Sequence, residues 1–425
     1  MRRAVKVRLY PTPAQETLFA RTAGAARFVY NAGLGLRIDA YKNDGLSVST
    51  YDLITMLPLW KEEFPWLSEV SSVALQQSLR NLDTAYKNFF SACKGEGKAR
   101  FPRFKTRNSR ASFRLTVGGF RVRDGQLFVA KSKEPIPFRD SGYALPEDAT
   151  SITISRDAAG RWFASLLVDD VVPLPETTGT KIVGIDLGVK TLAVTSDGEE
   201  FANPKHFDKR ARRLAKYQRM MARRAPKPGQ KASANYRKAQ AKAGRVHAKI
   251  ADSRRNAIHQ LTSSLVKRYD IIVIEDLNVA GLIKSKRMSR SISDAAWGEF
   301  RRQLEYKAGS PVGTPEGKQV PSWYGKKLVV IDRFSPTSKT CSVCKDVKQK
   351  LMLSEREWAC TGCGTLHDRD LNAAKNILAA GLAVLGSNVQ EACGGNVRPG
   401  PDSSGAGGPG EAGSSSEQRS ALSAA

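Results

Sequence analysis

The sequence predicts an α/β domain in the carboxyl-terminal half of the chain, preceded by a small β-barrel or sandwich that carries a helical insertion. Residues 181–188 form a short β-rich run that ends in glycine, which is typical of a buried strand. Residues 269–278 repeat this pattern directly after the helical spacing of residues 256–268, and this order indicates a helix followed by a parallel strand. Between residues 112 and 168, evenly spaced short segments with Gly and Pro turns indicate the barrel or sandwich.

The amino-terminal elements indicate where the insertion lies. Residues 5–10 alternate apolar and basic side chains like a strand, and Pro11 ends it. Apolar residues then recur with a period close to 3.6 over residues 14–37, and Thr12 is available as the N-cap of that helix. We expect further helices at 50–64 and 71–92, and strands at 112–117, 119–123, 126–130, 151–155 and 162–168. Because strand patterns flank the helices on both sides, we expect the helices to be inserted within the barrel.

The composition indicates a globular protein with a polyanionic partner. The 425 residues are 41% hydrophobic, and 68 Lys and Arg face 41 Asp and Glu, which gives a formal net charge of +27. Nucleic acid is the polyanion that best fits such a charge. A membrane is not expected, because there is no apolar run of about 18 residues and no apolar signal region after the first residues. We therefore expect a cytoplasmic protein; charge alone leaves a basic structural protein open.

Much of the charge is concentrated in residues 205–255. This segment holds 18 Lys and Arg, with Asp208 and Asp252 as its only acids, so it supplies +16 of the +27. Its residue types favour helix, and Pro226 to Gly229 should divide it into two helices joined by a turn. A solvated helical face is the alternative, but unbalanced charges at this density would repel one another. Contact with a nucleic-acid backbone is the better interpretation, and it would give affinity without sequence choice.

Acidic side chains follow both predicted strands of the α/β domain and open a late helix. Asp186 ends the first strand, Glu275 and Asp276 end the second, and Asp368 and Asp370 precede an Ala-rich helix. Each acid alone could be a turn residue or a cap, because a carboxylate at a helix start is stabilised by the free N–H groups there. Together, acids at two strand ends and one helix start are what a site with two hard cations and a scissile phosphate requires.

Two CxxC pairs form the most specific motif in the chain. Fifteen residues separate the inner cysteines of the pairs, a spacing typical of a tetrahedral zinc ribbon; the four cysteines are Cys341, Cys344, Cys360 and Cys363. Disulfides are not expected in a cytoplasmic protein, and a redox CxxC would not explain two pairs. Four thiolates leave no open position for water, so the zinc should be structural. Cys93 and Cys393 are isolated.

Taken in order, these motifs resemble those of the TnpB family, which are transposon-encoded, RNA-guided DNA endonucleases related to the compact type V CRISPR nucleases. The resemblance rests on GIDLG at 184–188, IEDL at 274–277, the paired CxxC motifs and DRDLNAAKNI at 368–377. Further matching segments are 26–31, 79–90, 101–104 and 291–297. Two departures are a Gly- and Pro-containing insertion at 309–322, expected to be an exposed loop, and a Gly-, Ser- and Pro-rich tail.

The resemblance implies an α/β RNase H-like (RuvC) nuclease domain with an inserted zinc ribbon, preceded by a wedge β-barrel that contains a helical recognition lobe. The implied boundaries are 1–12 and 100–175 for the wedge, 13–99 for the recognition lobe, 181–334 and 366–392 for the nuclease domain with its basic segment, 335–365 for the ribbon, and 393–425 for a disordered tail.

The resemblance also implies the site and the partners. Asp186, Glu275 and Asp370 match the family's acidic triad, which would hold two Mg²⁺ ions, while Asp276 and Asp368 rank second. The implied partners are a guide RNA from the transposon end and double-stranded target DNA. A short target-adjacent motif would be read by the N-terminal lobe, with Tyr51 and Gln76 as candidate contacts. The alternatives are an unguided RNase H-like transposase or nuclease, and a nuclease-dead, RNA-guided DNA-binding regulator.

Overall fold

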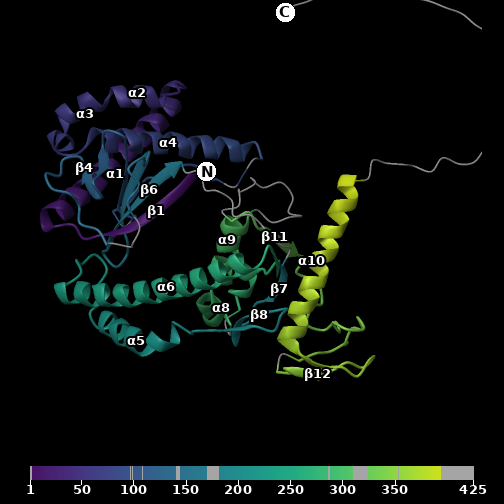
Figure 1. Cartoon of the computed structure of the whole chain (residues 1–425). Helices are drawn as coiled ribbons and strands as arrows, with labels where there is room; N and C mark the ends of the chain where they lie inside the picture. Colours follow the sequence, from purple (N-terminus) through teal and green to yellow (C-terminus); the bar gives the residue numbers. More distant parts are fainter. Residues whose placement is uncertain are drawn as a thin grey trace, which may run out of the picture.

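In the computed structural model, an amino-terminal part made of antiparallel strands and helices lies beside a carboxyl-terminal α/β part (Figure 1). The structure describes residues 2–95, 97, 99–107, 109–139, 144–169, 181–285, 288–309, 324–352 and 354–393. Residues 170–180 before the nuclease domain, nearly all of the 309–322 insertion and the tail from residue 394 lie outside these residues, so the exposed loop and the disordered tail stay predictions.

The amino-terminal strands pair as an antiparallel sheet in the order β1-β6-β5-β2, with a separate hairpin β3-β4. The bounds are β1 (Arg2–Leu9), β2 (Ser112–Thr116), β3 (Phe120–Arg123), β4 (Gln126–Val129), β5 (Ser151–Arg156) and β6 (Trp162–Asp169). All five strands predicted after residue 100 are present, and β1 pairs along its whole length with β6. The first strand therefore joins the later ones across the helical insertion, as predicted; closure of these strands into a barrel stays a prediction.

The insertion consists of α1 (Pro13–Asp44), α2 (Thr50–Thr55), α3 (Leu57–Glu63), the 3₁₀ helix η1 (Pro65–Glu69) and α4 (Ser72–Cys93). Thr12 caps α1 as predicted: its hydroxyl accepts from the Gln15 N–H at 3.3 Å, and the Gln15 side chain accepts from the Thr12 N–H at 3.0 Å. The single helix predicted at 50–64 is wrong. The chain breaks at Met56 because Pro58 has no N–H to continue the helix and instead lies in the first turn of a new one.

The carboxyl-terminal sheet has the order β11-β10-β7-β8-β9. Its strands are β7 (Ile182–Asp186), β8 (Thr191–Thr195), β9 (Glu200–Ala202), β10 (Ile271–Glu275) and β11 (Lys327–Ile331). The predicted parallel arrangement is confirmed, since β10 pairs in parallel with both β7 and β11. Helices α6 (Ala234–Arg268) and α9 (Trp297–Ala308) share one apolar core with this sheet, while α10 (Arg369–Cys393) packs on the other side.

The basic segment forms two helices, α5 (Asp208–Ala222) and α6, as predicted from its Pro-containing turn. They contact each other through a small apolar cluster that includes Leu214, Val246 and Ile250. Asp252, one of the two acids in this segment, forms an ion pair at 2.5 Å with Arg161, which immediately precedes β6. This pair docks α6 on the amino-terminal sheet. With Asp252 paired to Arg161, Asp208 is the one acid of residues 205–255 that remains for the Lys and Arg side chains of α5 and α6.

Helix α10 lies directly on β7 because Gly184 has no side chain. A Cβ at Gly184 would lie 2.3 Å from the Ala374 carbonyl oxygen and 2.5 Å from the Leu378 nitrogen, both of which are backbone atoms of α10. A Cβ at Gly381 would likewise lie 2.4 Å from Cγ1 of Val273 on β10. Two glycines therefore set the distance between the helix and the sheet. They also set the position of the residues at the start of α10, which include Asp370.

We expect Gly184→Ala to lower the free energy of unfolding by roughly 3 kcal/mol, because the backbone of α10 cannot move aside as a flexible side chain could. Chemical denaturation measures this change. Gly35→Ala is the matched control, since nothing lies within 4 Å of a Cβ at that helical position. It should be neutral or stabilise by up to about 1 kcal/mol through helix propensity. Equal stability of Gly184→Ala and wild type would contradict the close packing.

Candidate active site and metal centre

Asp186 and Glu275 stand at the carboxyl ends of neighbouring strands. In the parallel register of β7 and β10, Ile185 lies opposite Ile274, so the next residue on each strand is one of the two acids. Both strands are buried up to this point and end at the same edge of the sheet. Their register therefore places these two carboxylates together, as the sequence predicted.

Asp370 reaches the same edge from α10. It lies in the first turn of the helix, one turn before Ala374, which touches Gly184. Gly184 and Asp186 are two residues apart on a strand and so face the same side of the sheet, toward α10. Burial, then repulsion from Glu275 and from Asp370, raises the pKa of Asp186 to about 7. A buried carboxylate whose charge is disfavoured by two others suits a site that binds cations.

The two acids ranked second have structural partners instead. Asp276 accepts hydrogen bonds from the guanidinium groups of Arg301 and Arg333. Burial acts to raise the pKa of Asp276, but these hydrogen bonds outweigh it and the pKa is lowered. Asp368 accepts a hydrogen bond from the Leu371 N–H at 2.8 Å, as the N-cap of α10. Neither Asp276 nor Asp368 is among the carboxylates that raise the pKa of Asp186.

Two further side chains hold the acidic group, and neither was identified from the sequence. The Thr337 hydroxyl donates to Oε1 of Glu275 at 2.5 Å, and this bond opposes the rise that burial causes in the Glu275 pKa. Nη1 of Arg356 lies 3.2 and 3.3 Å from the two carboxylate oxygens of Asp370. Arg356 lies between the two CxxC pairs, where no spacing or periodicity in the sequence connects it with Asp370.

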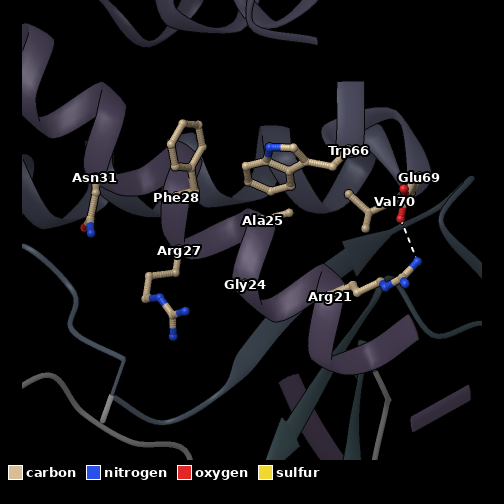
Figure 2. Close-up of a pocket in the computed structure, with 9 residues that line it drawn as sticks. All are labelled: Arg21, Gly24, Ala25, Arg27, Phe28, Asn31, Trp66, Glu69 and Val70. Atoms are coloured by element: carbon tan, nitrogen blue, oxygen red, sulfur yellow. Dashed lines mark hydrogen bonds and ion pairs between the residues drawn. The ribbon is translucent and has the colours of Figure 1, made fainter. Parts of the chain in front are cut away.

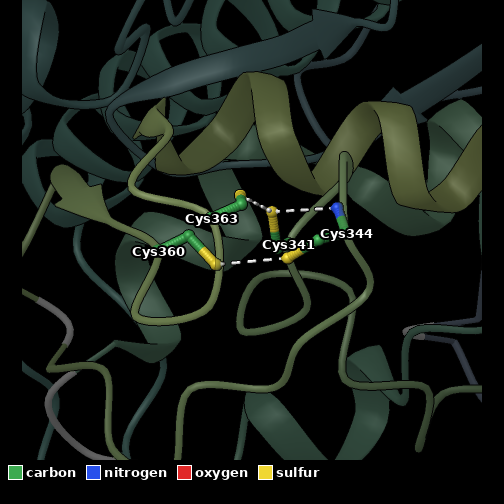
Figure 3. Close-up of side chains that lie close together, drawn as sticks. All are labelled: Cys341, Cys344, Cys360 and Cys363. Carbon is green, nitrogen blue, oxygen red and sulfur yellow. Dashed lines mark hydrogen bonds between the residues drawn. The ribbon is translucent and has the colours of Figure 1, made fainter.

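The four predicted cysteines gather at one point (Figure 3). Their sulfur atoms all lie within 4.8 Å of one another, with 3.7 Å between Cys341 and Cys363 and 3.4 Å between Cys344 and Cys360. Four thiolates at about 2.3 Å from a tetrahedral Zn²⁺ would be about 3.8 Å apart, so the cluster can hold one metal ion such as zinc. The carboxylates do not form a comparably compact cluster among the described residues. Cys93 is exposed and apart from the four.

The cysteine cluster is supported by a hairpin of β12 (Glu357–Ala359) and β13 (Leu366–Asp368). Trp358 and His367 are paired across it, and their rings lie 4.8 Å apart. Nε2 of the buried His367 lies 3.0 Å from Sγ of Cys341. A ring N–H directed at a cysteine sulfur is the kind of contact that orients a metal ligand. No pattern in the sequence marks His367, although it stands immediately before Asp368.

Two asparagines of α10 tie the cysteine ribbon to the acidic group. The side-chain amides of Asn372 and Asn376 donate to the Thr340 carbonyl at 2.8 and 2.6 Å, and Asn376 also donates to the Thr337 carbonyl at 2.9 Å. The Ser342 N–H in turn donates to the side chain of Asn372 at 2.9 Å. One loop therefore contacts α10 through its carbonyls, Glu275 through the Thr337 hydroxyl, and the cluster through Cys341.

The two candidate nucleic-acid contacts lie on neighbouring helices of the insertion. Tyr51 of α2 is 75% exposed, whereas Gln76 of α4 is half-buried. The two helices contact each other. Whether these side chains touch nucleic acid stays a prediction.

This geometry defines an α/β domain with acidic residues at one edge of its sheet and a zinc-ribbon-like cysteine cluster beside it. The fold is shared with a chain of the cryo-EM structure of the Cas12f1–sgRNA–target DNA complex, with a TM-score of 0.50, 14% identity, and coverage of 86% of this chain and 83% of that chain. Three family sequence profiles match: "Probable transposase" at residues 165–286, "Helix-turn-helix domain" at 1–45 and "Cas12f1-like, TNB domain" at 318–377.

Sequence relatives identify the family. A "Putative RNA-guided DNA endonuclease" of Streptomyces pristinaespiralis is 47% identical over 95% of this chain and 94% of its own length. InsQ of Escherichia coli K12, which carries the same description, is 32% identical over 93% of this chain and 95% of its own. The chain belongs to this TnpB family of RNA-guided DNA endonucleases, as its motifs indicated.

The amino-terminal segment has a different structure from the one that its matching profile names. Residues 2–44, which match a profile described as helix-turn-helix, fold as the strand β1 and one 32-residue helix, so this segment contains no pair of helices. Among the residues that the structure describes, no helix combines the length and apolarity needed to span a bilayer.

Proposed function

We propose that the protein is an RNA-guided DNA endonuclease of a transposable element that cuts double-stranded DNA beside a short target-adjacent motif. The observation that supports this proposal is a buried Asp186 whose charge is disfavoured by Glu275 and Asp370, on a chain with a net charge of +27. A nuclease-dead regulator would not need Glu275 and Asp370 beside a buried Asp186. An unguided transposase could share the triad, and only its need for RNA separates it from a guided enzyme.

The acidic group would hold magnesium through Asp186, Glu275 and Asp370. Two Mg²⁺ ions bound there supply an activated water and stabilise the leaving oxygen in phosphodiester hydrolysis. Thr337 would keep the Glu275 carboxylate in place. Arg356 would neutralise Asp370 until cations bind, and would then be free to contact a phosphate. Arg356 also lines a hollow of about 320 Å³ together with Lys190, Lys205 and Arg290, and with Asp208 and Asp294.

The remaining parts would share the binding of nucleic acid. Base pairing with the guide RNA would select the target, while the protein holds the heteroduplex through its backbone and shape. The α5–α6 pair would contact phosphates of the RNA that derives from the transposon end. The strands β1 to β6 would form the wedge barrel, and the helical insertion would read the motif with Tyr51 and Gln76. The cysteine ribbon would hold a structural Zn²⁺.

The proposal is tested by purifying the full chain, sequencing the RNA that copurifies, and assaying a library of DNA targets. Cleavage should require both Mg²⁺ and the RNA, and the cut targets should match the RNA beside one short motif. Cleavage that persists after ribonuclease treatment and RNA removal would favour the unguided nuclease. RNA-dependent binding without cleavage in Mg²⁺ would favour the regulator.

The choice between Asp370 and Asp368 gives a matched pair of variants. We expect Asp370→Asn to abolish cleavage, since after burial and Glu275 it is Asp370, and not Asp368, that raises the pKa of Asp186. Asp368→Asn should keep most activity and cost at most about 1 kcal/mol, because asparagine is also a good N-cap. Cleavage rates and thermal unfolding of both variants measure the difference. The assignment is wrong if Asp368→Asn is the inactive variant.

A further inference from the structure

A hollow of about 620 Å³ lies on the helical insertion between α1 and η1, away from the acidic group (Figure 2). The rings of Phe28 and Trp66 form one wall, 5.2 Å apart and edge to face. Small apolar residues, including Ala25 and Val70, line the rest of it. Trp66 is 41% exposed, which is unusual for so large an apolar side chain. The hollow therefore exposes aromatic and apolar surface to solvent.

Arg27 stands at the edge of this hollow. Its guanidinium makes no hydrogen bond or ion pair with any residue in the described ranges, whereas Arg21, at the opposite end of the hollow, is paired with Glu69 at 2.7 Å (Figure 2). Arg27 also lines a second cleft of about 380 Å³ between the helices and the amino-terminal sheet. That cleft presents Lys105, Arg110 and Arg114, and no acid is among its described lining residues.

An aromatic hollow beside an unpaired cation fits one nucleotide. A base can stack on or insert beside aromatic rings whatever its identity, while a guanidinium binds the adjoining phosphate. The charge around the hollow favours a polyanion over an apolar ligand. Arg27 also lines the second cleft, and all the charged residues among that cleft's described lining are cations. Between the nucleic acids, RNA is favoured: its unpaired bases are available for stacking, whereas the bases of double-stranded DNA are already paired.

We propose that this hollow binds an unpaired nucleotide of the RNA that the protein carries, with its base against Phe28 and Trp66 and its phosphate on Arg27. That the RNA is a guide rests on the function proposed above; the site itself does not. Contacts of this kind anchor an RNA independently of its target, so they act before any DNA is bound.

The test uses the purified full chain, freed of its copurifying RNA, with a short oligouridylate that carries 4-thiouridine. Ultraviolet cross-linking followed by peptide mapping should place the modified base on the peptides of Phe28 or Trp66. Arg27→Ala and Trp66→Ala should each reduce this cross-link and weaken binding about tenfold, in line with about 1–3 kcal/mol for a stacked base. Trp66→Phe should retain most of the binding, since a ring remains.

Arg21→Ala is the matched control, because it removes a cation at the same hollow that Glu69 already neutralises; it should change binding less than about twofold. Unchanged binding and cross-linking in both Arg27→Ala and Trp66→Ala, together with a cross-link elsewhere, would overturn the site. A stronger cross-link with a thio-substituted oligodeoxythymidylate would overturn the choice of RNA. A cross-link at the hollow in a protein that shows no RNA-dependent cleavage would leave the site standing and reject the guided nuclease.

Discussion

Asp186→Asn should abolish DNA cleavage, with a loss of at least about 10³-fold, while RNA binding stays within about twofold of wild type. Asparagine keeps the size of the side chain but removes the charge that cations at this sheet edge require. Single-turnover cleavage with the copurified RNA measures the loss, and filter binding measures the retained affinity. Full cleavage by Asp186→Asn would remove the central assignment.

The same substitution should stabilise the protein when no Mg²⁺ is added. The pKa of the Asp186 carboxyl is raised from 3.8 to about 7 on folding, so its ionised form is disfavoured in the folded state. This cost is absent below the unfolded pKa of 3.8, grows as pH rises, and is complete above about pH 7. Asn at this position should therefore stabilise the fold by up to about 4 kcal/mol at neutral pH, and this gain should vanish toward pH 4.

Asp276→Asn provides the contrasting control on the neighbouring strand end. The pKa of Asp276 is lowered on folding, so its ionised form contributes stability above its unfolded pKa, and that stability is lost as pH falls. Its variant should be destabilised at neutral pH, opposite in sign to Asp186→Asn. Denaturation curves of the two variants against pH measure both effects. Equal signs would contradict the environments seen for the two carboxylates.

Cys341→Ser should remove the bound metal and, with it, cleavage. The Cys341 side chain is fully buried, and Zn²⁺ binding by four thiolates contributes on the order of 10 kcal/mol to local folding. Loss of the ribbon would release the loop that holds Thr337 against Glu275, and would also release Arg356. Elemental analysis should find about one Zn²⁺ per wild-type chain and markedly less in the variant.

Cys93→Ser is the control for this prediction, since Cys93 is exposed at the end of α4 and far along the chain from the ribbon. It should keep both metal and activity. The four-cysteine site would be contradicted if Cys341→Ser still bound one equivalent of Zn²⁺ and cut DNA at the wild-type rate.

Local patterns were sufficient to predict most helices and strands and the four-cysteine cluster. The apolar run before Glu275 marks a buried strand, the preceding helical spacing gives its parallel direction, and the CxxC spacing marks the metal cluster. These signals lie within a few residues of one another, so they can be recognised without knowing the fold. The helix break at Met56 could also have been predicted, because Pro58 was visible in the sequence.

Contacts between distant segments could not be predicted in this way. Thr337 and Glu275 are separated by 62 residues, and the hollow at Phe28 depends on how η1 packs against α1. The proposed choice of Asp370 over Asp368 depends on which side of the first turn of α10 faces β7, and that depends on Gly184. Each of these is set by packing between elements, for which one sequence carries no periodic signal.

The close packing of α10 on Gly184 means that the acidic group is completed late in synthesis of the chain. Residues 182–186 of β7 and the start of α10 are neighbours in space but lie far apart in the order of synthesis. Asp186 and Glu275 leave the ribosome long before the third carboxylate, and until α10 follows, the sheet face at Gly184 has no cover. A nascent chain would thus carry RNA-binding lobes well before it carries a complete acidic group, so RNA could be loaded before the enzyme is able to cut.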